Sequence, residues 1–152
     1  MTYRLFSWEH SYFSGKARAH LRYKERMRDL GEGYEDILAT PELTEGLLKP
    51  ATGSIAIPQL QTSDGSWIQD SSDIIDFIEA SHTKVPVIPS AAEAPLQALV
   101  SYLVELLGDE WMVVPAFWER WHYSLPGVEP NHAHYNAMQW GSMFAAAAPG
   151  KV

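Results

Sequence analysis

The 152-residue sequence predicts an α/β domain followed by a helical part, and three observations support this. Through about residue 82, short apolar segments typical of strands alternate with segments whose apolar residues recur at helical spacing. An Asp64-Gly65 pair gives a hairpin signal inside that region. From Pro95 onward, apolar residues recur at helical spacing only. The predicted order is βαβ followed by ββα, which implies one mixed sheet with a parallel pair first and an antiparallel hairpin second.

A first strand is predicted over residues 3–8 (Tyr-Arg-Leu-Phe-Ser-Trp). A helix follows, because Phe13, Ala17 and Leu21 fall at i, i+4 and i+8 and form one inward face. Residues 34–38 read as a second short strand.

The limits of this first helix are predicted from local signals. Ser11 or Ser14 can cap its start with a side-chain oxygen. Gly31 and Gly33 are expected to stop it, since glycine accepts the left-handed backbone that ends many helices.

The middle of the domain is less regular. Residues 41–48 predict a weak, short helix that Pro50 and Gly53 break. Residues 55–61 read as a third strand. It contains Pro58, and a proline inside a strand usually marks an edge or a special peptide bond.

The domain is expected to close with a hairpin and a helix. The turn at Asp64-Gly65 leads into an antiparallel strand that starts at Trp67-Ile68. The run Asp70-Ser71-Ser72-Asp73 then caps a helix. Its apolar face consists of Ile74, Ile75, Phe77 and Ile78.

We therefore expect one domain over residues 1–82, a linker over 83–94 and a partial helical domain over 95–152. In the helical part Pro115 is expected to kink or end the first long helix, and residues 131–144 can start one more. The apolar stripe of that helix consists of Leu96, Leu99, Val100, Leu103, Leu106 and Leu107.

Composition excludes several functions. The sequence contains no cysteine, which excludes disulfides, thiolate metal sites and CxxC redox chemistry. The net charge is −8, although residues 1–30 carry a balance of +4. We read the basic run, which consists of Lys16, Arg18, Arg22, Lys24, Arg26 and Arg28, as a solvated helix face and a charged helix end; a local positive field for a small anion is the alternative. We expect no nucleic-acid partner, because the remaining residues are acidic.

We also expect a soluble, cytoplasmic protein. No long apolar run follows Met1, so we expect no signal peptide, and charged residues interrupt the most apolar window, so we expect no membrane span. His132 and His134 near Glu129 have only loose metal-ligand spacing, and we expect no metal.

The arrangement resembles the glutathione S-transferases, whose N-terminal domain is thioredoxin-like. Four features carry the resemblance, closely over residues 3–82 and more loosely over 95–123. They are the run Ser11-Tyr12-Phe13-Ser14-Gly15-Lys16-Ala17-Arg18 after the first strand, the pair Ile57-Pro58, the Asp64-Gly65 turn followed by Ile68-Gln69-Asp70-Ser71, and the proline-bearing linker.

The resemblance implies that glutathione binds as a co-substrate and that Ser11 activates its thiol. Ser11 can also be a plain N-cap serine, and Tyr12 and Ser14 are alternatives for the catalytic role. Phe13 belongs to the same binding turn. His10 could act as a base, although an ordinary loop histidine is the simpler interpretation.

The resemblance implies that Ile57 and a cis Pro58 hold the peptide backbone of glutathione; an ordinary edge proline is the alternative. Asp70 and Ser71 would meet its γ-glutamyl end, or serve simply as a helix cap. Lys49 is the nearest cation for the glycyl carboxylate, because the usual basic residue before the third strand is replaced by Thr52-Gly53-Ser54.

Two functions remain open. The first is an enzyme that uses glutathione to attack electrophiles. The second is a binding or interaction module that keeps the fold without turnover. Only 58 residues follow Ala94, fewer than the helical domain of the family needs, so the chain looks truncated. We expect the exposed apolar surface of residues 95–125 to drive association, for example as a homodimer.

Overall fold

The structure is a computed structural model that describes residues 2–122, 127 and 131–146, with the side chains of 144–146 excepted. The chain divides into two compact units, Met1–Pro89 and Ser90–Val152. We call them the first and second units. The elements of the first unit are β1 Tyr3–Ser7, α1 Tyr12–Arg26, β2 Tyr34–Leu38, α2 Pro41–Leu43, the π-helical segment η1 Thr44–Leu48, α3 Lys49–Thr52, β3 Gln59–Gln61, β4 Trp67–Gln69 and α4 Ser71–Ser81.

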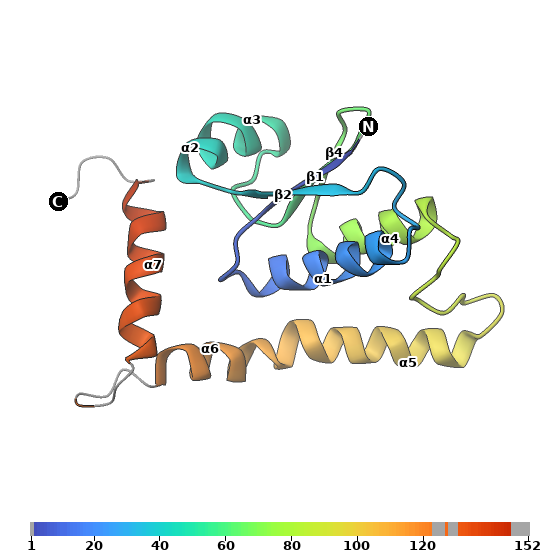
Figure 1. Ribbon diagram of the computed structural model, residues 1–152. Helices are drawn as coiled ribbons and strands as arrows, with labels where there is room; N and C mark the ends of the chain where they lie inside the picture. The colour runs from blue at the N-terminus through green and yellow to red at the C-terminus, as the bar shows by residue number, and fades with distance from the viewer. Residues whose placement is uncertain (1, 123–126, 128–130, 147–152) are drawn as a thin grey trace. The chain divides into compact units, whose positions relative to one another are not determined.

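The first unit contains one four-stranded mixed sheet in the order β2-β1-β3-β4. β1 pairs in parallel with β2, whereas β3 runs antiparallel to both β1 and β4. The helices lie on both faces, α1 and α4 on one and α2 and α3 on the other (Figure 1). The predicted βαβ-ββα domain is therefore confirmed.

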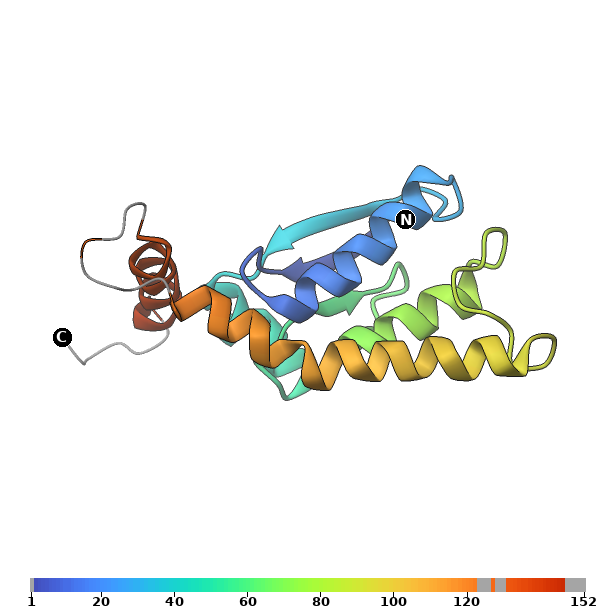
Figure 2. The same cartoon turned by 90° about the horizontal axis from the view of Figure 1, so that it is seen from below.

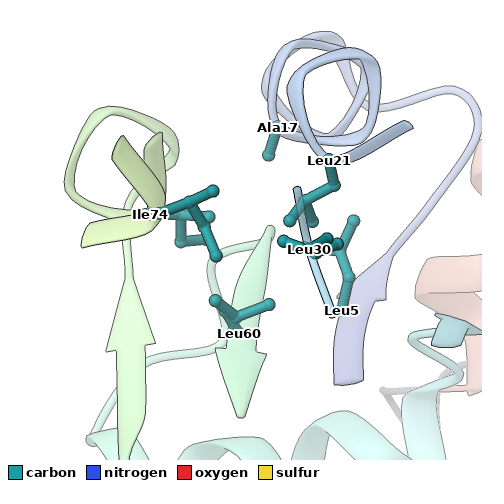
Figure 3. Close-up of a cluster of buried hydrophobic side chains, with 7 residues drawn as sticks. Leu5, Ala17, Leu21, Leu30, Leu60 and Ile74 are labelled. Carbon is teal, nitrogen blue, oxygen red and sulfur yellow. The ribbon is translucent and has the colours of Figure 1, made fainter. Parts of the chain in front are cut away.

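The core forms on both faces because alternate residues of a strand point to opposite sides of the sheet. Leu5 of β1 is fully buried with Leu60 of β3 beneath α1 and α4 (Figure 3). The two helices run side by side over this face (Figure 2). The next residue, Phe6, is buried on the opposite face against Leu48 and Ala39.

The prediction that Pro50 breaks the helical stretch is wrong, because that stretch runs on to Thr52. Pro115 is the third residue of a separate helix that begins at Val113, after the helix from Pro95 has passed into a π-helical segment and a turn. A proline clashes with the carbonyl four residues earlier and lacks an N–H. In both places that earlier residue, Gly46 or Trp111, belongs to a π-helical segment, whose wider turn accommodates the ring.

Two predicted boundaries also shift. α1 stops at Arg26, before the expected Gly31 and Gly33, and Arg28 takes a left-handed φ of 55°. The third strand starts at Gln59 rather than at residue 55. The break predicted at Gly53 is confirmed: this residue caps α3 with a φ of 77°, which suits a residue without a Cβ.

The second unit is helical. It contains α5 Pro95–Leu106, the π-helical segment η2 Leu107–Trp111, α6 Val113–His122 and α7 His132–Ala146. The helix predicted from residues 131–144 is confirmed. α6 and α7 are joined by a 3.0 Å hydrogen bond from Asn136 Nδ2 to the Arg120 carbonyl oxygen. None of the described helices is long and apolar enough to cross a membrane.

Candidate functional site

Ser11 is the N-cap of α1. Its φ of −80° and ψ of 123° are extended, and its Oγ accepts a hydrogen bond from the Ser14 N–H at 3.2 Å. The capping role predicted for Ser11 is therefore present. Because the Oγ accepts from the helix, its hydroxyl hydrogen is left to point to another acceptor. The N-terminal end of α1 adds a favourable field for a negative charge.

Ser14 shapes the turn before the helix. It is fully buried, and its Oγ accepts a 3.4 Å hydrogen bond from the Trp8 N–H. The Ser11 N–H in turn donates to the Trp8 carbonyl at 3.1 Å. These bonds fix the path from the end of β1 to the cap, and burial favours a positioning role for Ser14 over direct ligand contact.

A polar network centred on buried Ser7 lies at the end of β1, next to the same turn. Ser7, the last residue of β1, is 1% exposed, and its Oγ donates to Asp36 Oδ1 and accepts from Arg18 at 2.6 Å. Arg18 Nε also donates to Asp36 Oδ2 at 2.6 Å. The sequence analysis missed this network, because only the fold brings β1, β2 and α1 together. It ties the end of β1 to its neighbours and so supports the site.

Pro58 follows a cis peptide bond from Ile57, as predicted, and is fully buried. The hydrogen-bonded ladders of the sheet begin only at Gln59, so Ile57 lies outside both of them. The buried side chain of Gln59 donates through Nε2 to the carbonyls of Ser54 and Ala56, each at 2.9 Å. This contact shapes the loop that carries Ile57.

Asp70 is the N-cap of α4, with its side chain accepting from the Ser72 N–H at 2.8 Å. Its φ of 93° is left-handed, which is unusual for a residue with a side chain. Ser71, the first residue of α4, is 3% exposed. Asp70 therefore caps the helix, as one of the two sequence interpretations predicted. A backbone held in such an unusual conformation often accompanies a functional site.

Strand register brings these features to one edge of the sheet, by which we mean the edge where β1 and β4 end and β3 begins. Phe6 of β1 lies opposite Gln59 of β3, and Gln59 lies opposite Gln69 of β4. The turn to Ser11 leaves β1 just after Phe6, Pro58 directly precedes Gln59, and Asp70 directly follows Gln69. Three segments far apart in the sequence therefore meet at the same sheet edge.

Lys16 adds a cation that the sequence analysis had treated as part of a solvated helix face. Its Nζ donates a 2.8 Å hydrogen bond to Ser72 Oγ, in the first turn of α4. An ammonium group therefore lies beside the second helix N-terminus of the site. The sequence shows that Lys16 lies four residues after Tyr12, at the start of the predicted helix. It does not show that Ser72 is the hydrogen-bond partner of Lys16.

Of the remaining candidates, Tyr12, Phe13 and His10 are half-buried and Lys49 is exposed. Tyr12 and Phe13 meet edge to face, with ring centroids 5.3 Å apart. Lys49 is paired with Glu45 at 2.8 Å on the surface. His10 packs on Trp8, with ring centroids 5.1 Å apart.

The described residues contain no group of three side chains suited to hold a metal ion. His132 and His134 lie on α7, and Glu129 falls outside the described part of the chain.

The family profile described as glutathione S-transferase, N-terminal domain, matches residues 5–86, which is more than half of the chain. The chain belongs to the glutathione S-transferase family. The match covers the whole sheet edge described above. No curated protein sequence matches the chain at a significant level.

Solved glutathione transferases share the fold. One from Methylobacterium radiotolerans, in complex with glutathione sulfonate, has a TM-score of 0.62 at 24% identity, over 93% of this chain and 64% of its own. A homologue from Sulfitobacter with bound glutathione has a TM-score of 0.59 at 16% identity, over 96% and 67%. The Tau class enzyme of mango has a TM-score of 0.61 at 19% identity, over 92% and 59%. The chain thus spans about two thirds of the length of these transferases or less.

Proposed function

We propose that this glutathione S-transferase family protein binds glutathione at the sheet edge formed by Ser11, Pro58 and Asp70, and that Ser11 activates the thiol of glutathione. The observation that carries the proposal is the strand register, which brings two helix N-termini and one unpaired backbone segment to a single edge. Each part matches one part of an anionic, extended peptide.

The peptide backbone of glutathione would pair with Ile57. An extended peptide can add to a sheet where backbone groups lie outside the existing ladders. Ile57 lies outside the ladders that β3 forms with β1 and β4, and Pro58 itself contributes no N–H. Ile57 therefore suits the cysteinyl part of the ligand.

The γ-glutamyl end would meet the start of α4. The Asp70 carboxylate suits the ammonium group, and the Ser71 hydroxyl with the helix N-terminus suits the carboxylate. The Lys16 ammonium, held at the first turn by Ser72, adds positive charge at the same place. Lys49 remains the candidate for the glycyl carboxylate, and it would have to leave Glu45 to reach it.

The thiol would lie at the start of α1. A thiol with an ordinary pKa of about 8.5 is only a few per cent ionised at neutral pH. Lowering that pKa by about two units requires about 2.7 kcal/mol of thiolate stabilisation. A hydrogen bond from the Ser11 hydroxyl, together with the field of the helix start, supplies stabilisation of this size.

The structural relatives support the ligand class. The Methylobacterium enzyme is in complex with glutathione sulfonate and the Sulfitobacter homologue holds glutathione. Reduced glutathione is kept in the cytoplasm, so we infer that the protein acts there.

Isothermal titration and thermal denaturation with glutathione test the proposal. A ligand at 100 times its dissociation constant adds about 2.7 kcal/mol of stability, which raises the melting temperature measurably. Thiolate absorption of the complex, compared with S-methylglutathione as the matched control, reports activation separately from binding. No melting shift with either ligand at high concentration would overturn the proposal. A melting shift without thiolate absorption would support glutathione binding and would contradict activation of the thiol by Ser11.

A non-catalytic interaction module is the second candidate, and the second unit favours it. No residue of α5 is buried, and its apolar side chains are exposed over much of the helix surface. We infer that residues 95–122 associate with a second copy of the chain. The exposed apolar residues of α5 are Leu96, Leu99, Val100, Tyr102, Leu103, Val104 and Leu106.

A further inference from the structure

Lys24 is a fully buried cation near the end of α1, away from the proposed ligand edge. Its Nζ donates to the carbonyl oxygens of His82 at 2.7 Å and Val85 at 2.9 Å. It also forms ion pairs with Asp29 Oδ2 at 3.1 Å and Glu79 Oε1 at 2.9 Å. A buried ammonium needs this many partners, because an unpaired one would destabilise the fold strongly.

The two carboxylates bind the same chain segment from its other side. Asp29 accepts from the Lys84 N–H at 3.2 Å and from the Val85 N–H at 3.0 Å. Glu79 Oε2 accepts from the N–H groups of Val87 at 2.9 Å and Ile88 at 3.3 Å. Three charged side chains thus hold six backbone groups of residues 82–88, the stretch that leaves α4 within the first unit.

Three further titratable groups face this cluster. His20 of α1 lies with Nε2 3.1 Å from Glu79 Oε1. The His82 ring bonds through Nδ1 to the Asp29 carbonyl oxygen at 2.7 Å, and through Nε2 to the Tyr3 hydroxyl at 2.9 Å. The cluster therefore joins β1, α1, the turn after α1 and α4 to the segment.

We propose that Lys24, Asp29 and Glu79 form a latch that holds segment 82–88 against the first unit and that opens in acid. Ordinary secondary structure does not hold this segment, which lies outside every described helix and strand. Its backbone is bound by ionised side chains instead. Protonation of the carboxylates removes the charges that balance buried Lys24, so the bonds to the segment are lost together.

The electrostatics of the cluster agree with acid opening. Burial opposes ionisation of Asp29, but its bonds from Val85 and Lys24 outweigh burial and lower its pKa. The pKa of Glu79 is also lowered, with burial again opposed by Lys24 and by the Val87 and Ile88 N–H groups. Both carboxylates are stabilised in their ionised form by the folded protein. Protonation in acid removes this stabilisation and so weakens the latch.

Opening changes the connection between the two units. Seven residues now held in a fixed path would join residues 89–94, which precede α5. An extended chain spans about 3.5 Å per residue, so the released segment can itself span up to about 25 Å. The latch thus sets the effective length of the connection.

Limited trypsin digestion near neutral pH tests the latch, because the Lys84–Val85 peptide bond lies inside the held segment. In Glu79→Gln and Lys24→Met we expect cleavage after Lys84 at least tenfold faster than in the unchanged protein. Lys49→Met is the matched control, since it removes a surface ion pair and trypsin cleaves poorly before Pro50. Mass spectrometry of the fragments identifies each cut.

Two outcomes would overturn the latch. One is an unchanged rate after Lys84 in a Glu79→Gln protein that remains folded. The other is equal acceleration at Arg18 within α1, which indicates global unfolding. Hydrogen exchange of the unchanged protein at about pH 7 and about pH 3 tests the acid step, because the lowered pKa values of both carboxyl groups require a pH below their ordinary values of about 4. We expect the Val85 and Val87 amides to lose protection at least tenfold while Leu5 keeps its own, and equal retention would refute acid opening.

Discussion

The Nζ of Lys16 donates a 2.8 Å hydrogen bond to the Oγ of Ser72 and so joins the fifth residue of α1 to the first turn of α4. The two helix N-termini of the site are thereby linked by one cation. In the proposed complex this ammonium lies beside the γ-glutamyl carboxylate of glutathione. The contact makes Lys16 a test of the site that the family resemblance alone did not suggest.

Lys16→Met is expected to weaken glutathione binding by about threefold to twentyfold, since a partly exposed charge at a helix start contributes about 0.5–2 kcal/mol. Titration calorimetry at low and high salt measures it, and the loss should shrink at high salt. Arg26→Met, at the exposed end of the same helix, is the control. Equal affinities in the two variants would show that Lys16 serves the helix contact alone.

Ser11→Ala is expected to lower kcat/KM toward a thiol-reactive electrophile by at least about tenfold, because a hydrogen bond to a charged group contributes about 1.5–3 kcal/mol. Loss of the cap costs about 1 kcal/mol of stability in the same variant. Ser11→Thr keeps both the hydroxyl and the cap, and should recover most of the rate. Unchanged turnover in Ser11→Ala would move the catalytic role to Tyr12 or Ser14.

Asp70→Gly is expected to be more stable than Asp70→Ala by about 1–2 kcal/mol. Both changes remove the carboxylate, but glycine adopts the left-handed φ of 93° without strain and is a better N-cap than alanine. Urea denaturation measures the difference. Both variants should bind glutathione more weakly, because the ammonium loses its carboxylate. An alanine variant as stable as the glycine variant would contradict the backbone argument.

The free energy of unfolding is expected to be flat between about pH 6.5 and about pH 9 and to fall in acid. Burial lowers the pKa of His20 in the folded protein, with Glu79 opposing and Lys24 adding to the effect. The unfolded chain therefore binds a proton first, and stability begins to fall below the ordinary histidine pKa of about 6.5. Asp29 and Glu79, also with lowered pKa values, add a steeper loss below about pH 4.5.

Urea denaturation across this pH range measures the profile. His20→Gln should flatten the part between about pH 5 and 6.5 and leave the lower part in place. A profile in this variant identical to that of the unchanged protein would assign the upper part to another group.

The chain is expected to associate through its second unit. Leu99 and Leu103, one turn apart on α5, are 54% and 51% exposed. A double change of both to Glu places charge in the proposed contact and should shift sedimentation toward the monomer. Tyr23→Glu, which alters an exposed aromatic residue of the first unit, is the control. A monomeric unchanged protein at high concentration would disprove the association.

Local signals in the sequence were sufficient for much of the first unit. The periods of apolar residues predicted β1, α1 and α4, and Asp64-Gly65 predicted the turn between β3 and β4. These elements follow from side chains close together in the chain. The break predicted at Pro50 failed because the widened turn of η1 accommodates the proline ring, and no local residue pattern indicated that turn.

The sequence by itself determined the fold class and named the residues of the sheet edge, because caps, turns and the Ile57-Pro58 pair are short-range features. Only the tertiary structure decided which polar and charged side chains pair with one another around and beyond this edge. The Ser7–Arg18–Asp36 network, the Lys16–Ser72 contact and the Lys24 cluster join residues from 5 to 61 positions apart. Such pairings depend on how strands and helices stack, and the charge pattern of a linear sequence fits a solvated helix face equally well.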